Sequence, residues 1–297
     1  MRVLVTGWPS FRHGEATAGD VQSMYAVHRA LADAGIDGEL AWSPGFRRGA
    51  LSLADVDPSR YTDVVFACGP LRGEQVRWLH RRFAGCRRIA VGVSVLDRAD
   101  PAVTGFHHVF PRDGGESATV DLSATAPTEA RPVVGVVFAP GQPEYGGNGR
   151  HRRVHDRLTS WLGRRDCASV TVDTRLDTAD WRHCGTPDQL VSLLGRFDLV
   201  VSTRLHGLVL GLRAGTPVLA VDPVAGGGKV SAQSAALRWP AIVGADAVLA
   251  GDDALAQWWD WCRSAEGRAA AGRCATAARS AADAEVGRVV RLLQDPP

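Results

Sequence analysis

The chain has 297 residues, with 34 basic and 32 acidic side chains and a formal net charge of +2. This length suits two domains of ordinary size, and a composition of 45% hydrophobic and 22% charged residues is typical of a folded globular protein. With a net charge close to zero, the protein has no overall electrostatic field that would attract nucleic acid or a membrane surface.

Cysteine usage and the N-terminus indicate the compartment. The six cysteines lie far apart and form no Cys-x-x-Cys pair, so we expect free thiols and no metal site. The first ten residues, MRVLVTGWPS, have the pattern of a short strand rather than a signal peptide, and no segment holds the roughly eighteen apolar residues of a membrane span. The sequence therefore predicts a cytoplasmic protein without an integral membrane segment, and it leaves the oligomeric state unknown.

The first half of the chain alternates short apolar segments with helical patterns, which is typical of an α/β fold. Strands are predicted at 2–7, 38–42, 62–69 and 87–96, and helices at 19–35 and 73–85. Between 99 and 132 this alternation ends, and the Ser-, Thr-, Ala- and Pro-rich end of the stretch predicts a linker.

The alternation starts again after the linker. Strands are predicted at 132–141, 168–173, 198–203 and 216–222, and helices at 151–163, 186–197, 204–214 and over much of 252–293. The sequence thus predicts two Rossmann-like domains, residues 1–130 and 131–297, each a doubly wound parallel sheet, which face each other across a cleft. The second domain carries a helical tail.

Ligands of doubly wound sheets bind at the carboxyl ends of the strands, close to helix N-termini. This rule selects four loops of the sequence for closer attention. They are residues 8–20, 138–150, 202–206 and 222–229.

The loop at 202–206 holds an Arg-Leu-His triplet. A buried strand ends in Ser202 and Thr203, and a helix then begins with Arg204, Leu205 and His206. Arg204 and His206 are two residues apart, so on a regular helix their side chains do not share a face. At a strand-to-helix turn, however, both side chains can face a ligand, beside free backbone N–H groups. A lone histidine is more often a cap or packing residue; its place at a strand end favours function here.

The loop at 222–229 contains the only lysine of the chain, Lys229, after three glycines. Such a loop can close its backbone around an anion. It is not a Walker A loop, because Val230 follows the lysine. The Gly-rich loop 138–153 is a second candidate anion cradle, or else a mobile surface loop, with polar side chains at Asn148, Arg150 and Arg152.

The first loop carries Arg12, His13, Glu15 and Asp20, which are candidates for contact with a substrate. Asp20 follows Gly19 at the start of a helix, so a first-turn dipole role is the simpler interpretation. The segment TGWPS does not fit Gly-x-Gly-x-x-Gly, and a dinucleotide fingerprint is therefore absent.

Together these motifs resemble the polysaccharide pyruvyl transferase family. The resemblance is carried by Gly19-Asp20 at the first helix, by AVGVSVL at the end of the first domain, and above all by STRLHGLVLGLRAGTPVLAVDPVAGGGKV. In the last block the Arg-Leu-His triplet stands at a strand end, and Lys229 falls where the family has a lysine. The family is similar in fold to GT-B glycosyltransferases, which agrees with the two predicted sheets.

The resemblance implies transfer of a pyruvyl group from phosphoenolpyruvate, as co-substrate, to two hydroxyls of a sugar or small-molecule acceptor. The C-terminal domain would hold the donor through Arg204, Lys229 and the neighbouring loop residues, with His206 as general acid. The N-terminal domain would hold the acceptor through the first loop. No cofactor is implied. The sequence departs from the family at Phe138 and Ala139, where an arginine is usual.

Two other functions stay open at this point. A GT-B glycosyltransferase that uses a nucleotide sugar would need a base-stacking site and a carboxylate for the ribose, for which Asp222 and Asp246 are candidates. A non-catalytic homologue is favoured by the missing family arginine and disfavoured by the retained Arg204, His206 and Lys229.

Overall fold

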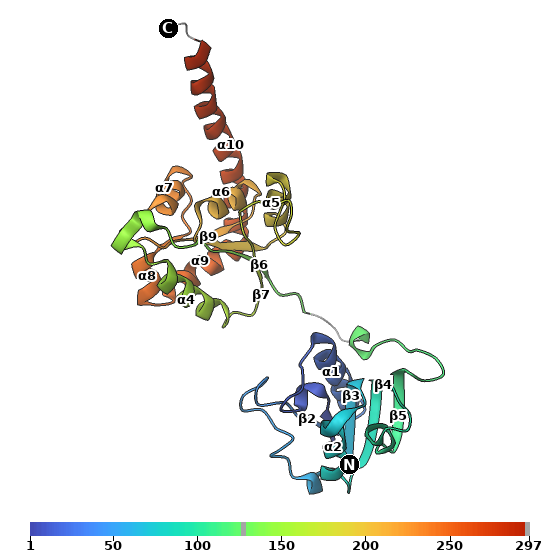
Figure 1. Cartoon of the computed structure of the whole chain (residues 1–297). Coiled ribbons are helices and arrows are strands. Elements are labelled where there is room, and N and C mark those ends of the chain that lie inside the picture. Colours follow the sequence, from blue (N-terminus) through green and yellow to red (C-terminus); the bar gives the residue numbers. More distant parts are fainter. Residues whose placement is uncertain (126–128, 295–297) are drawn as a thin grey trace. The chain divides into compact units, whose positions relative to one another are not determined.

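The computed structural model describes residues 1–125 and 129–294. The chain separates into two compact units, Met1–Glu129 and Ala130–Pro297, next to the boundary that the linker composition predicts. Each unit is an α/β fold around one five-stranded parallel sheet, as the sequence predicts (Figure 1). The predicted cleft between the domains stays a prediction.

The sheet of unit 1 has the strand order β2-β1-β3-β4-β5. Its strands are β1 (Arg2–Thr6), β2 (Asp37–Leu40), β3 (Asp63–Pro70), β4 (Arg87–Ser94) and β5 (His108–Asp113). The helices are α1 (Ala18–Asp33), α2 (Gly73–Arg82) and α3 (Pro101–Thr104), with short 3-10 turns at η1 (Trp8–Ser10), η2 (Pro58–Arg60) and η3 (Leu122–Thr125). Sequence reasoning missed β5, because its register with β4 shifts twice and three of its residues are charged or histidine.

Two apolar clusters fill unit 1, one on each face of the sheet. Beneath α1 lie Val5, Met24 and Trp42. Beneath α2 lies the larger cluster, which includes Phe66 and Leu79. The central strand β3 is buried on both faces, which explains why it reads as a continuous apolar run rather than an alternating one.

The sheet of unit 2 has the strand order β10-β9-β8-β6-β7. Its strands are β6 (Val133–Val137), β7 (Ala168–Thr171), β8 (Leu199–Ser202), β9 (Val218–Asp222) and β10 (Ile242–Gly244). Helices α5 (Pro187–Leu194), α6 (Leu205–Arg213) and α7 (Lys229–Ala236) cover one face, and α4 (His151–Leu162), α8 (Ala245–Ala250) and α9 (Asp253–Arg263) cover the other (Figure 1). The loop after β6 contains η4 (Pro143–Asn148).

Two helix starts have threonine caps. The Thr17 hydroxyl caps α1 by accepting from the Asp20 N–H, and the Thr186 hydroxyl caps α5 by accepting from the Gln189 N–H. Pro187 occupies the first turn of α5, where its missing N–H costs nothing.

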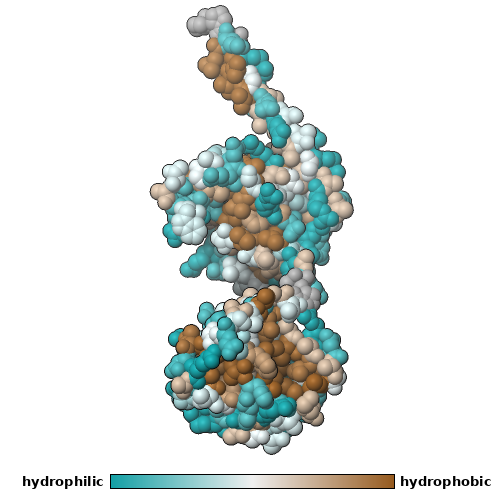
Figure 2. All heavy atoms as spheres, turned by 90° about the vertical axis from the view of Figure 1, so that its right-hand side faces the viewer, coloured by the Kyte–Doolittle hydropathy of each residue, from teal (hydrophilic) through white to brown (hydrophobic). Residues whose placement is uncertain are grey.

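The tail consists of α9 and α10 (Ala265–Gln294). Only the start of α10 packs on unit 2, through Gly267, Ala271 and Cys274. Toward its end Val286, Val289 and Leu293 are exposed, and Figure 2 shows brown, hydrophobic surface on this helix. Within the described residues no helix is both long and apolar enough to cross a bilayer.

Candidate functional site

The Arg-Leu-His triplet lies where β8 ends and α6 begins. Arg204 is the N-cap residue of α6, and its N–H donates to the Ser202 hydroxyl over 3.0 Å. The Ser202 hydroxyl in turn donates to the Arg204 carbonyl over 2.8 Å. Ser202 is fully buried, so its hydroxyl shapes the turn from inside.

Thr203 has a comparable structural task. Its hydroxyl accepts from the Ala139 N–H over 2.9 Å and lies 3.0 Å from His155 Nε2. Only 1% of Thr203 is exposed. The hydroxyls of Ser202 and Thr203, which were predicted to contact a donor, are therefore already engaged within the protein.

The Arg204 side chain, at the end of β8, pairs with the carboxylate of Asp173, which follows β7. Strand β6 lies between β8 and β7 in the sheet. The Arg204 Nη1 atom lies 3.1 Å from Asp173 Oδ1, and both side chains are largely buried. Burial raises the pKa of Asp173, but hydrogen bonds from Arg175 and the charge of Arg204 outweigh it and hold the pKa below its usual range. The predicted cation is thus in place but not free.

His206 differs from Arg204 in its surroundings. It lies in the first turn of α6, is exposed to solvent, and has no hydrogen-bond or ion-pair partner among the described residues. Leu205 beside it is half-buried. An exposed imidazole at the start of a helix is accessible to a ligand at the carboxyl edge of the sheet.

The two glycine-rich loops of unit 2 form one surface. Gly149 and Val224 make an isolated antiparallel bridge, the Arg150 N–H donates to the Pro223 carbonyl, and the Ala225 N–H donates to the Asn148 carbonyl. The loop after β6 therefore lies directly against the loop after β9. The two loops that the sequence predicts as separate anion-binding sites therefore form one surface in the tertiary structure.

Lys229 stands at the edge of this joined surface. It is the first residue of α7 rather than part of a flexible loop, with Gly228 as N-cap. Its Nζ atom lies 3.9 Å from Glu144 Oε1, and 41% of its side chain is exposed. Arg150 donates to the Gly147 carbonyl, while Arg152 is exposed on α4. Lys229 and Arg152 are accessible from solvent, whereas Arg150 is half-buried and bonded to a backbone carbonyl.

Asp222 organises the loop that leads to Lys229. The carboxylate is fully buried and accepts from the backbone N–H groups of Val224, Gly228 and Ser231, over 3.1, 2.7 and 2.7 Å. Its oxygens are thus used within the protein, and the expectation that Asp222 binds a ribose is not supported by this geometry. Asp246 lies on α8, after β10.

Two histidines on α4, which sequence reasoning missed, face this region. His151 is 6% exposed, its Nε2 atom has no partner among the described residues, and burial lowers its pKa against the opposing charges of Asp222 and Glu144. Burial, and then the charge of His151, lowers the pKa of His155 to about 4. Their spacing of four residues on one helix face was the available signal.

Phe138, at the position of the usual family arginine, forms an aromatic pair. Its ring stacks on His155 with the centroids 4.6 Å apart and the planes 3° from parallel. A cavity of about 320 Å³ lies beside this pair and is also lined by Pro140, Asp173 and Arg175. The site thus presents an aromatic edge, a carboxylate and a guanidinium at the carboxyl end of β6 and β7.

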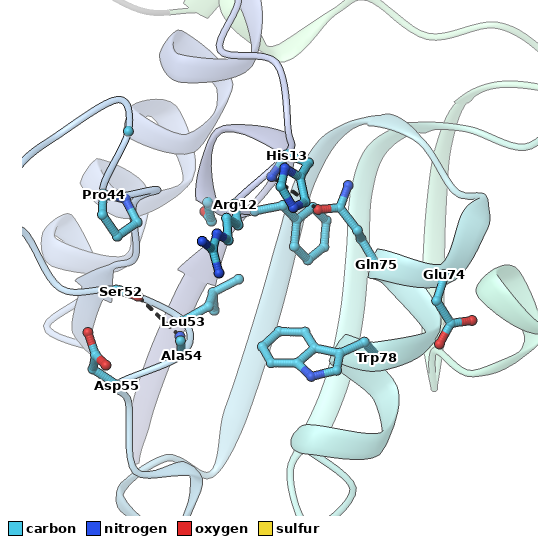
Figure 3. A pocket seen from close by; sticks show the side chains of 13 residues that line it. Arg12, His13, Pro44, Ser52, Leu53, Ala54, Asp55, Glu74, Gln75 and Trp78 are labelled. Atoms are coloured by element: carbon cyan, nitrogen blue, oxygen red, sulfur yellow. Dashed lines mark hydrogen bonds between the residues drawn. The ribbon is translucent and has the colours of Figure 1, made fainter.

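In unit 1 the first loop separates into two parts. Arg12 and His13 line a cavity of about 830 Å³ between the loop after β1 and α2 (Figure 3). Asp20 instead accepts from the Thr17 hydroxyl over 2.7 Å at the start of α1, and Glu15 is exposed outside the cavity lining. The structure brings together only two of the four residues predicted for the acceptor.

No group of three or more His, Cys, Asp and Glu side chains in residues 1–125 and 129–294 is arranged to hold a metal ion. All six cysteines, which fall within these ranges, are free thiols.

Solved structures with some likeness to the chain are glycosyltransferases. The spinosyn rhamnosyltransferase SpnG in complex with thymidine diphosphate is 14% identical, with 99% of this chain and 100% of that chain covered and a TM-score of 0.34. SpnG in complex with spinosyn aglycone is 15% identical, with the same coverage and a TM-score of 0.36. The Escherichia coli ADP-heptose lipopolysaccharide heptosyltransferase II is 14% identical, covering 89% and 98%, with a TM-score of 0.29. Similarity at this level carries no information on ligands.

Comparison with curated proteins and protein families gives a narrower result. No curated protein matches the chain. A family model does match residues 150–223, a segment that contains Arg204, Leu205 and His206 and ends six residues before Lys229. Over residues 150–223 the chain is thus confirmed to resemble the polysaccharide pyruvyl transferases.

Proposed function

We propose that the chain is a pyruvyl transferase that uses phosphoenolpyruvate and a hydroxyl-bearing acceptor. The observation that carries the proposal is the family match over 150–223, because this segment contains the strand-to-helix turn with Arg204 and His206. The joined glycine-rich loops add Lys229 and Arg150 from the same unit. This is the cationic surface that a donor with a phosphate and a carboxylate requires.

The proposed reaction consumes one proton at phosphoenolpyruvate and releases two from the acceptor hydroxyls. A proton is added to the methylene carbon of phosphoenolpyruvate, which makes the neighbouring carbon electrophilic, and a first acceptor hydroxyl attacks that carbon and loses its proton. The carbon–oxygen bond to phosphate then breaks, and a second hydroxyl attacks and loses its proton. One of the two released protons replaces the one consumed, and the other leaves with phosphate. His206, which is exposed and has no partner among the described residues, is the proposed acid for the first step.

Arg204 reaches the donor by exchanging partners. In the structure its guanidinium is paired with Asp173, which also accepts from the Arg175 backbone and side chain. A phosphate or carboxylate offers the same bidentate acceptor geometry as Asp173. When Arg204 turns to the donor, Asp173 keeps its hydrogen bonds from Arg175. Its negative charge is therefore still partly neutralised.

A second candidate is a glycosyltransferase with a nucleotide-sugar donor. The observation that favours it is Phe138, which replaces a family arginine by an aromatic ring beside a cavity of about 320 Å³ lined by Asp173. An aromatic surface can stack a base, and a carboxylate can accept from ribose hydroxyls.

Thermal unfolding with each donor class separates the two candidates. Ligand at about 100 times its dissociation constant stabilises by roughly 2.7 kcal/mol, a shift on the order of 5–10 °C for a domain of this size. We expect that shift with phosphoenolpyruvate, and its loss in Lys229→Ala and Arg204→Ala. Arg213→Ala, at the opposite end of α6, is the matched control.

A shift with a UDP-, GDP- or dTDP-sugar and none with phosphoenolpyruvate would replace the pyruvyl proposal by the glycosyltransferase. No shift with any of these compounds would contradict both donors and favour a non-catalytic homologue.

A further inference from the structure

One cavity within unit 1 has the size of a small-molecule site. Its volume is about 830 Å³, within the range of roughly 300–1,000 Å³ typical of such sites. It lies between three chain segments: the loop after β1, residues 44–55 after β2, and the first turns of α2. All of these segments belong to unit 1.

The apolar part of the cavity wall is continuous with the core of unit 1. Phe11 and Leu53 are each 3% exposed, because they continue the core cluster under α2. Trp78, half-buried, packs on the same cluster and forms one side of the cavity (Figure 3). The Phe11 ring is further held by Trp8 and Phe66, with centroid distances of 5.6 and 5.9 Å. A ligand here meets fixed rings rather than mobile side chains.

Polar residues also line the cavity. Ser10 and Ser52 are buried, and their hydroxyls are bonded to the backbone of unit 1. The exposed polar lining residues are Arg12, His13, Asp55 and Glu74. The Arg12 guanidinium has no hydrogen-bond or ion-pair partner in the described part of the chain, and Figure 3 shows it beside Leu53 at the cavity. The His13 N–H donates to Gln75 Oε1 over 3.4 Å, which ties the loop to α2. Asp55 stands at the opposite rim (Figure 3).

This distribution discriminates between classes of acceptor. A glycan chain carries hydroxyls on all sides, and each hydroxyl buried against an apolar wall without a partner weakens binding. An apolar ring system instead gains from contact with Phe11, Leu53 and Trp78. A single anionic or carbonyl group at its edge would satisfy Arg12.

We propose that this cavity binds an apolar, ring-bearing small molecule with one anionic or carbonyl edge at Arg12, and that such a molecule, not a polysaccharide, is the acceptor. The acceptor role rests on the proposed transferase function. The binding chemistry itself does not, because it depends only on the cavity.

The test uses 8-anilinonaphthalene-1-sulfonate, which combines apolar rings with one sulfonate, titrated by fluorescence into the full-length protein. We expect a saturable site that is weakened at least tenfold in Trp78→Ala. Trp181→Ala is the matched control, because Trp181 is 91% exposed in unit 2, and it should change the affinity less than twofold. Arg12→Gln should weaken binding by 3- to 10-fold, with Arg213→Gln unchanged.

Unfolding of the Trp78→Ala protein would also abolish binding, so a second variant that fills the cavity separates the two causes. Ala54 lies on the exposed rim, so Ala54→Trp adds bulk to the cavity without disturbing the core, and it should abolish the site at unchanged melting temperature. Testosterone, a hydroxylated four-ring probe, should displace the dye, whereas cellohexaose should not.

Dye affinity unchanged in both Trp78→Ala and Ala54→Trp would overturn the proposal. Displacement by cellohexaose and not by testosterone would also overturn it, in favour of a polymer acceptor. Donor stabilisation through Lys229 is measured in unit 2 without the dye, so failure of this cavity and failure of the proposed donor are seen separately.

Discussion

Arg204 Nη1 lies 3.1 Å from Asp173 Oδ1, so the arginine of the predicted donor motif is held by a carboxylate 31 residues earlier in the chain. The pair spans the carboxyl edge of the sheet from β8 toward β7. Both side chains are partly buried, so solvent screens their attraction less than that of an exposed pair, and Asp173 competes inside the protein with any anionic donor.

Removing the competing carboxylate should increase donor affinity. We expect Asp173→Asn to bind phosphoenolpyruvate several-fold more tightly than the natural chain, because Arg204 no longer has to break a charge pair. Isothermal titration measures the change, with Asp180→Asn as the matched control, since Asp180 is similarly exposed but pairs with Arg182 rather than with Arg204. Unchanged or weaker binding in Asp173→Asn would mean that the carboxylate orients Arg204 for the donor.

Loss of the imidazole at 206 should reduce turnover strongly. A positioned general acid contributes roughly 10²–10⁴-fold to a rate, so His206→Ala should lower kcat by about that factor in an assay of phosphate release once an acceptor is identified. His206→Gln keeps the size but not the proton transfer and should behave like alanine. Near-normal turnover in either variant would remove His206 from the mechanism.

The stability of unit 2 should fall as the pH drops below neutrality. Burial, followed by the charge of His151, lowers the pKa of His155 to about 4, whereas an unfolded histidine titrates near about 6.5. Between these values the unfolded state binds more protons, so the contribution of neutral His155 is complete above pH 6.5 and is lost as the pH falls toward 4.

Urea unfolding of the His155→Gln variant checks this prediction. The variant should lose less free energy of unfolding between pH 7 and pH 4.5 than the natural chain, and His206→Gln, at an exposed position, should lose as much as the natural chain. Equal pH dependence for all three proteins would contradict the assignment to His155.

The buried carboxylate of Asp222 should stabilise unit 2 by shaping the lysine loop. Three backbone N–H groups donate to it, and Asp222→Ala leaves them without an acceptor in a buried place. Hydrogen bonds to a charged group are worth about 1.5–3 kcal/mol each, and we expect a loss on the order of 3 kcal/mol in urea unfolding because the loop relaxes in part. Asp246→Ala, an exposed control, should change stability by less than about 0.5 kcal/mol.

Two glycines of α10 should respond in opposite directions to alanine. A Cβ at Gly267 would lie 2.2 Å from the Trp261 carbonyl oxygen, a backbone atom that cannot move aside without shifting the chain. A Cβ at Gly272 meets nothing within 4 Å. Gly267→Ala should therefore lower the melting temperature, while Gly272→Ala should add about 0.5–1 kcal/mol through helix propensity. The same sign for both would contradict the packing of the α10 start on α9.

The sequence by itself determined the fold class, the alternation of elements and the positions of the strand ends. These follow from local rules: buried parallel strands read as apolar runs, and helix starts are marked by threonine caps such as Thr17 and Thr186. The Arg-Leu-His triplet could be placed at the edge of a sheet for the same reason.

Only the tertiary structure decided which of these strand ends meet and what occupies them. The pairing of Arg204 with Asp173, and the joining of the loops at Gly149 and Val224, depend on the strand order β10-β9-β8-β6-β7, in which residues distant in sequence become neighbours. The apolar cavity beside Trp78 likewise arises from three segments that no local pattern connects. Periodicity records which face of an element is buried, but the partner across that face is set by long-range packing.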